Sequence, residues 1–274
     1  MYNRKLMIED SLPPLDPPEF KQLRESLSVP ASYDVDLVNF KSDAVKCFSN
    51  TTVNRLQGLD AFENHDVITG CQQYVDNLIS KNGISGLQIF EHDYHYYKKI
   101  DPAIQYVNVD TLSPAKPLLM ALPFPGFLGK HPHMYAILEK CNTENIDVHL
   151  DCAWIPCAFD IHFDFNQSCI KSFAMSFSKA YALNWSKIGI RWTREKDPTD
   201  SVSVLNEMKA VPRLHVYVAS QYMDRFSIDH CVKKYKDKYY EICKSLKLRP
   251  TNIIHACSSI DRKNLYGLKN LMTD

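Results

Sequence analysis

The chain has 274 residues, of which 45% are hydrophobic and 23% are charged, so it can bury one large core or two small ones. Its 32 basic side chains equal its 32 acidic ones, which argues against nucleic acid as a partner and leaves small polar substrates open. Nine cysteines, an odd number without a Cys-x-x-Cys pair, favour free thiols in a reducing compartment, and we therefore expect a cytoplasmic protein.

The first part of the chain has a composition unlike the rest. Residues 1–30 are rich in proline and charge and include SLPPLDPPEF, so residues 1–50 are expected to form an N-terminal arm or irregular lead. They lack the continuous apolar stretch of a signal peptide, and the longest apolar run, 117–129, is broken by two prolines and a glycine. We therefore expect no segment that spans a membrane.

From about residue 60, short apolar runs alternate with segments of helical period. Helices are expected over QQYVDNLISK and HMYAILEKC, where apolar residues recur on one face. This alternation predicts an α/β protein, a three-layer α/β/α sandwich around a mostly parallel seven-stranded sheet, over residues 51–225. The seven candidate strands are residues 67–69, 87–90, 106–109, 117–122, 148–154, 172–177 and 188–192.

After residue 192 the pattern becomes helical, with a break at Pro212 and a long helix expected over residues 227–248. A cluster of lysines on that helix is interpreted as a solvated face. Residues 249–274 show no convincing sheet. We therefore expect residues 226–274 to form the long helix and a small C-terminal remnant.

Ligands of parallel α/β proteins bind at the carboxyl ends of the strands, so polar residues directly after each apolar run are candidates for a site. Gly70, Cys71 and Gln72 follow the first run, where backbone N–H groups at a helix start can hold a phosphate. An ordinary strand-to-helix turn would look the same. Asp151 ends the fifth run, either facing a cation or solvent or capping a helix.

The sixth run is followed by a lysine. Lys179 comes after the hydroxyl residues Ser176 and Ser178, in SFSKAYALNWSKIG. A partly desolvated lysine can have a lowered pKa and act as an amine nucleophile. The alternative is an ordinary surface lysine.

Together these strand ends resemble a known family. The spacing of Asp151, Trp154, Ser176, Lys179 and Lys187 resembles the fold type I pyridoxal phosphate (PLP) enzymes, in particular the class I/II aminotransferases of the aspartate aminotransferase type. The resemblance covers roughly residues 55 to 245. It implies pyridoxal 5'-phosphate bound to a lysine as a Schiff base, with an aspartate on the pyridine nitrogen.

The resemblance assigns a role to each matching residue. It implies that Lys179 carries the Schiff base and moves protons as general acid/base, and that Asp151 keeps the ring nitrogen protonated. It also implies that Ser176 and the turn of Gly70, Cys71 and Gln72 hold the phosphate, and that Tyr94, in FEHDYHYY, stacks on the cofactor ring.

Four departures from the family pattern stand out. Lys187 replaces an arginine and lacks its bidentate fork, and Trp154 replaces a tyrosine and cannot ionise. The loop PFPGFLG, residues 123–129, has Phe124 about where the family has an asparagine. The chain is also short at its C-terminal end, and neither of its late arginines, Arg249 and Arg262, matches the substrate-carboxylate arginine.

The leading prediction is a homodimeric PLP-dependent aminotransferase acting on an amino acid and a 2-oxo acid. Two alternatives stay open: another PLP reaction of lyase or decarboxylase type, which needs no arginine in the usual place, and a catalytically degenerate protein that keeps the fold as a binding module. No metal site is expected, because the histidines at 131, 133, 149 and 162 lack the context of metal ligands.

Overall fold

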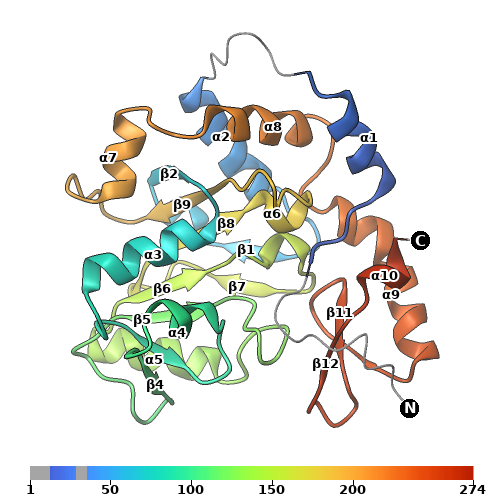
Figure 1. The fold of residues 1–274 in the computed structure, drawn as a ribbon. Coiled ribbons are helices and arrows are strands. Elements are labelled where there is room, and N and C mark those ends of the chain that lie inside the picture. The colour runs from blue at the N-terminus through green and yellow to red at the C-terminus, as the bar shows by residue number, and fades with distance from the viewer. Residues whose placement is uncertain (1–12, 29–35, 274) are drawn as a thin grey trace.

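The computed structural model describes residues 13–28 and 36–273. Its centre is a seven-stranded sheet whose strand order is β2-β9-β8-β6-β5-β3-β4 (Figure 1). Each strand coincides with one of the seven predicted apolar runs, so the predicted α/β architecture is confirmed. The strands are β2 (Asn64–Ile68), β3 (Gln88–Phe90), β4 (Gln105–Val107), β5 (Leu118–Ala121), β6 (Val148–Asp151), β8 (Ile170–Ser176) and β9 (Gly189–Thr193).

The sheet is mostly parallel, with β9 as the exception. The pairs β3·β4, β3·β5, β5·β6 and β6·β8 are parallel, whereas β9 runs antiparallel to both β2 and β8. Gly189, the first residue of β9, is in register with Ile68 and Ser176, the last residues of its two neighbours. A Cβ on Gly189 would lie 2.2 Å from the carbonyl oxygen of Met175, so only glycine fits there. The beginning of β9 therefore lies at the edge where β2, β6 and β8 end.

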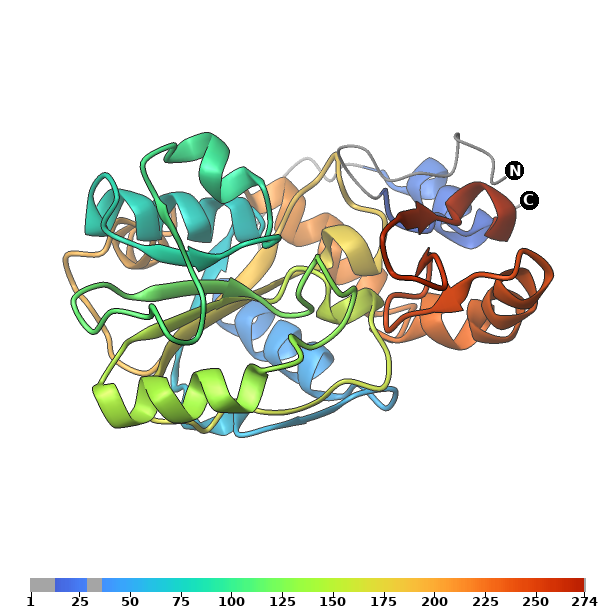
Figure 2. The same ribbon diagram turned by 90° about the horizontal axis from the view of Figure 1, so that it is seen from below.

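Helices cover both faces of the sheet (Figure 2). On one face α3 (Cys71–Asn82), α4 (Tyr96–Ile100) and α7 (Ser201–Glu207) share a core with Ile89, Leu119 and Ala174 of the strands. On the other face α2 (Leu37–Ser49), α5 (Met134–Glu144) and α8 (Arg213–Met223) belong to a second, larger core. In the described part of the chain, none of the helices has the length and hydrophobicity that crossing a bilayer requires.

The N-terminal part is more regular than the sequence predicts. It contains α1 (Pro18–Ser26) and α2, so the expectation of an irregular lead is wrong for these residues. Phe20 of α1 is fully buried, and α2 begins after Asp36, whose side chain accepts hydrogen bonds from the backbone N–H groups of residues 38 and 39. Proline stands at the first turn of α1, where a missing N–H costs nothing. Residues 1–12 and 29–35 lie outside the described part of the chain.

The C-terminal part combines the predicted long helix with a sheet that was not predicted. Helix α9 (His230–Ser245) is followed by β10 (Arg249–Pro250), β11 (Ala256–Ser258), β12 (Leu265–Gly267) and α10 (Lys269–Met272). The three strands form an antiparallel sheet, so the expectation of no sheet is wrong. Strands of two or three residues are too short to show an alternating pattern. On α9, Lys234 reaches Glu19 of α1 at 2.6 Å and thereby ties this part to the N-terminal helix.

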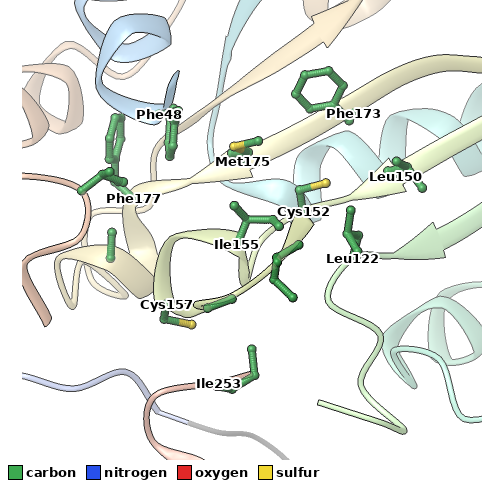
Figure 3. Close-up of a cluster of buried hydrophobic side chains, with 14 of the residues drawn as sticks. Phe48, Leu122, Leu150, Cys152, Ile155, Cys157, Phe173, Met175, Phe177 and Ile253 are labelled. Carbon is green, nitrogen blue, oxygen red and sulfur yellow. The ribbon is translucent and has the colours of Figure 1, made fainter. Parts of the chain in front are cut away.

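The remaining short elements connect these layers. A two-stranded parallel sheet joins β1 (Arg55–Gln57) to β7 (His162–Asp164). The 3-10 helix η2 (Leu59–Ala61) follows β1, η3 (Ile155–Cys157) follows β6, and α6 (Phe177–Ala180) follows β8. Figure 3 shows the buried side chains beneath η3 and α6, where Phe48 of α2 stacks on Phe177 with ring centroids 4.4 Å apart. This packing fixes the two segments that follow the central strands.

Two buried charged groups link elements of the fold. Arg191 of β9 lies 2.6 Å from Asp66 of β2 and 2.8 Å from Asp200, the residue that caps α7. Asp93, which follows β3, accepts hydrogen bonds from the backbone N–H groups of Ala121 in β5 (3.1 Å) and Tyr94 (2.6 Å). Burial raises the pKa of Asp93 to about 8.

Replacing Arg191 by methionine should destabilise the fold strongly, because it leaves two carboxylates buried without a cation. We expect the free energy of unfolding to fall by about 3 to 5 kcal/mol in urea titrations. Lys196→Met is the matched control, since its ion pair with Glu207 is exposed on both sides and should contribute little to stability. Equal losses in the two variants would contradict the structural role of Arg191.

Asp93→Asn should flatten the dependence of stability on pH. With a pKa of about 8 in the folded chain against an ordinary 3.8, the unfolded chain loses the proton first. The contribution of Asp93 is therefore complete below about pH 4 and is lost as the pH rises to about 8. At roughly 1.4 kcal/mol per pKa unit, the wild type should lose on the order of 2 to 4 kcal/mol more than the variant between pH 5 and 8.

The measurement is urea unfolding of both proteins at the two pH values. Comparing them cancels the opposite contributions of His149 and His255, whose pKa values burial lowers to about 4 and about 3. Parallel pH profiles for the wild type and the variant would show that Asp93 does not titrate as described.

Candidate functional site

A cavity of about 510 Å³ lies at the edge of the sheet where the parallel strands end. Its walls come from segments that are far apart in the sequence and that the sheet topology brings together. Every residue predicted for the site lines this one cavity: Gly70, Cys71, Gln72, Tyr94, Asp151, Trp154, Ser176, Lys179 and Lys187.

One end of the cavity is suited to an anion. Gly70 has φ 86°, in the region that favours glycine, and a Cβ on it would lie 3.5 Å from Cβ of Lys187 and 3.8 Å from Oγ of Ser176. Helix α3 begins directly after it, so the first N–H groups of a twelve-residue helix lack intrahelical acceptors here. Lys187 Nζ donates to Oε1 of Gln72 at 2.5 Å. One small space is thus bordered by a glycine, a helix start, a hydroxyl group and an ammonium group.

Ser176 also shapes the segment that carries the lysine. It is the last residue of β8 and the N-cap of α6, and its Oγ accepts a hydrogen bond from the N–H of Ser178 at 3.2 Å. The same Oγ lies 2.9 Å from Oγ of Ser178 and 3.1 Å from the carbonyl oxygen of Ile188. Ser178, which also lines the cavity, is therefore held beside Ser176.

Lys179 projects from α6 into a poorly solvated region. Burial lowers the pKa of its amine, the cations Lys187 and Lys269 lower it further, and the thiol of Cys157 opposes the shift. A lowered pKa increases the fraction of neutral amine, which is the nucleophilic form. The electrostatics therefore favour the predicted nucleophile over an ordinary surface lysine.

Asp151 is the buried carboxylate of the cavity. It ends β6 with 5% of its surface exposed, and burial raises its pKa. Three donors favour the charged form: the N–H of Ala153 reaches Oδ1 at 3.0 Å, the hydroxyl of Tyr97 reaches Oδ2 at 3.1 Å, and the thiol of Cys71 adds a weaker hydrogen bond. The hydrogen bond from Ala153 is a local contact within the turn after β6. The cavity also leaves room for a cationic ligand beside the same carboxylate.

Two aromatic side chains form further parts of the wall. Tyr94 lies after β3, and its ring meets that of Tyr97 edge-to-face, with centroids 5.6 Å apart. Trp154 lies at the start of η3 and is half-buried. Both residues pack against the core and also line the cavity.

The loop after β5 differs from the expectation. Phe124 is fully buried, packs against Phe127 and His131 with centroids 5.7 and 4.8 Å apart, and does not line the cavity. Pro123, Pro125 and Leu128 form the wall instead. This wall is apolar, so the segment that replaces the family's asparagine loop offers the cavity no hydrogen-bonding side chain.

Several cavity residues were not predicted. His95, Asn184 and Leu265 line it, and Tyr97 reaches Asp151 from behind the wall. The only sequence signal for Tyr97 is its place three residues after Tyr94, on the same side of a helical turn. Among the described residues no arginine lines the cavity, and no group of three or more histidine, cysteine or acidic side chains could hold a metal ion.

No protein-family model and no curated relative matches the chain. Solved structures do match. Against a double mutant of aspartate aminotransferase from Thermus thermophilus the identity is 13% and the TM-score 0.63, covering 93% of this chain and 77% of that one. The PLP-bound C-S lyase from Staphylococcus hominis is 11% identical with a TM-score of 0.66, and the match covers 94% of this chain and 78% of that one. Cystalysin from Treponema denticola, whose structure contains pyridoxal 5'-phosphate, is 12% identical with a TM-score of 0.67. That match covers 93% of this chain and 77% of the other.

These matches extend over nearly the whole chain and concern the arrangement of its elements. They cover 93 to 94% of this chain, so most of its helices and strands belong to the matched region. The chain therefore has the fold of the fold type I pyridoxal phosphate enzymes, which aminotransferases and C-S lyases share.

Proposed function

We propose that the chain is a PLP-dependent enzyme of aminotransferase type that moves an amino group between an amino acid and a 2-oxo acid, with residues 51–225 as its cofactor-binding domain. One observation carries the proposal: a single cavity combines an amine of lowered pKa, a buried carboxylate, an aromatic ring and an anion cradle. PLP has an aldehyde, a ring nitrogen, a flat ring and a phosphate, and each of these needs one of the four groups.

The anion cradle supports a phosphate in particular. The space that a Cβ on Gly70 would fill lies between that residue, Ser176 and Lys187. The helix start at Cys71 and Gln72 adds N–H donors and a favourable dipole. In this proposal these five residues hold the phosphate, and their own contacts keep the cradle in shape without a ligand.

The ring would lie between the phosphate cradle and the lysine. Tyr94 would stack on one face of the ring, and Asp151 would hold a proton on the ring nitrogen through its negative charge. When bound, the cofactor supplies an electron sink for the bond that breaks at the amine-bearing carbon. The half-buried Trp154 and the apolar wall of the loop after β5 would limit the access of water.

Lys179 would do the proton chemistry. Its Nζ would hold the cofactor at the aldehyde group, and as a free amine it would accept a proton from the substrate α-carbon and give the same proton back. The lowered pKa suits this task, since a neutral amine can accept a proton near neutral pH. The short helix α6, capped by Ser176, holds the amine in place.

A C-S lyase reaction is the second candidate. It is favoured by the absence of arginine from the described cavity wall, because amino-group transfer to a 2-oxo acid usually relies on a cation for the carboxylate. One of the similar structures is a PLP-bound C-S lyase. In both reactions Lys179 and Asp151 would keep the same roles.

We place the protein in the cytoplasm as a homodimer. All nine cysteines are free and eight are buried, which suits a reducing compartment. Trp185 is 54% exposed and adjoins the cavity residue Asn184, so a large aromatic surface lies next to the cavity lining. A second subunit covering this surface would lie beside the cavity.

Purified with PLP, the wild type should show a visible absorption band, and borohydride reduction should leave a covalent adduct that maps to Lys179 by mass spectrometry. Lys179→Ala should lose both signals. Lys171→Ala is the control, since that side chain pairs with Asp147 at 3.6 Å and belongs to the opposite end of β8.

Amino acids added to the PLP-loaded protein should then convert the absorption band and release 2-oxo acids. Transamination would leave the amine on the cofactor, whereas a lyase reaction would set ammonia free. A band that never responds would indicate a binding protein, and no adduct would exclude the enzyme.

Lys187→Arg should tighten cofactor binding. Arginine can place two N–H donors on a phosphate where lysine offers a point charge, so we expect the Kd for PLP to fall roughly three- to tenfold. Lys187→Met should raise the Kd. Fluorescence titration of cofactor-free protein measures both, and an arginine variant that binds as poorly as the methionine variant would place the phosphate elsewhere.

A further inference from the structure

Tyr97 is a buried tyrosine that contacts the proposed site from behind. It lies on α4 with no exposed surface, and its hydroxyl donates to Oδ2 of Asp151 at 3.1 Å. Its ring meets Tyr94 edge-to-face at 5.6 Å. One side chain therefore contacts both the carboxylate and the aromatic wall.

The contact matters because Asp151 is poorly solvated. Burial is the largest influence on its pKa and favours the neutral carboxyl, whereas the N–H of Ala153, the hydroxyl of Tyr97 and the thiol of Cys71 favour the carboxylate. A thiol is a weak donor, so Tyr97 is the strongest side-chain donor to this charge. Burial raises the pKa of Tyr97 well above its usual value, which keeps the phenol protonated and able to donate.

The titratable groups that face Asp151 are neutral or mostly neutral below pH 7. Burial raises the pKa values of Cys71, Cys152 and Tyr94, which stay neutral at physiological pH. Asp93, with a pKa of about 8, is mostly protonated below pH 7. Between pH 5 and 7, Asp151 therefore faces no second negative charge from these groups.

We propose that Tyr97 is a positioning residue that holds Asp151 ionised and oriented, and thereby sets how firmly the cofactor's ring nitrogen keeps its proton. The coupling to the ring nitrogen rests on the proposed function. The effect of Tyr97 on Asp151 concerns the protein alone. A hydrogen bond to a buried charge is among the stronger ones in proteins, so its loss should be visible in the titration of Asp151.

The test uses Tyr97→Phe, which removes the hydroxyl and keeps the ring against Tyr94. Tyr74→Phe is the matched control: Tyr74 is equally buried in the same core, and its hydroxyl contacts Ser172 at 2.8 Å. Both variants are made also in an Asp93→Asn background, so that only one of the two buried carboxyls titrates.

In cofactor-free protein with ¹³C-labelled aspartate, NMR follows the carboxyl of Asp151. Tyr97→Phe should raise its titration midpoint by about one pH unit or more, and Tyr74→Phe should leave it in place. Identical midpoints in the two variants would overturn the proposal, whatever the cofactor does.

The second arm uses PLP labelled with ¹⁵N in the ring. The ring nitrogen should stay protonated to higher pH in the wild type and in Tyr74→Phe than in Tyr97→Phe, and Asp151→Asn should lose the proton altogether. A ring nitrogen that titrates alike in all four proteins would overturn the proposed coupling. A shifted Asp151 midpoint without any Lys179 adduct in the wild type would instead refute the proposed function and leave the contact to Asp151 established.

Discussion

A carboxylate buried at the end of a central strand is the constraint on which the site depends. Asp151 is 5% exposed, and its position follows from β6, which lies between β5 and β8 in the middle of the sheet. Removing a charge from water is costly unless hydrogen bonds or a cation compensate for it. The backbone of Ala153, the hydroxyl of Tyr97 and the thiol of Cys71 supply the hydrogen bonds, and the cavity leaves room for the cation.

The sheet topology brings the other groups to that carboxylate. Strands β2 and β8 end at the same edge as β6, which places Gly70 and Ser176 there. Because β9 runs antiparallel to β8, the connection between the two strands stays at this edge, and Lys187, just before β9, lies next to Gly70 although 117 positions separate them in the sequence. Beneath the edge, the packing of Phe48 on Phe177 supports α6 and hence Lys179 (Figure 3). The chemistry therefore comes from four short segments that only the sheet holds together.

The fold leaves the choice of reaction to a few side chains. Aminotransferases and C-S lyases both match this chain, at identities of 11 to 14%. In this protein the loop after β5 contributes Pro123, Pro125 and Leu128 to the cavity wall. These apolar side chains shape the cavity and offer no cation for a carboxylate. In the proposed function, the choice of reaction would therefore depend on the other residues of the wall.

The sequence by itself determined the strands of the central sheet, helices α3, α5 and α9, and nine of the residues that line the cavity. The strands and helices depend on local periodicity, and most of the nine residues lie at or just after the ends of apolar runs. The inward packing of α1 and α2, the short C-terminal sheet and the turn of Phe124 away from the cavity were decided by tertiary contacts. The hydrogen bond from Tyr97 to Asp151 joins residues 54 positions apart, and the burial that raises the pKa of Asp93 comes from packing between strands and helices. Local sequence patterns carry no information on these two effects, because desolvation and hydrogen bonds between distant segments exist only once the layers have packed.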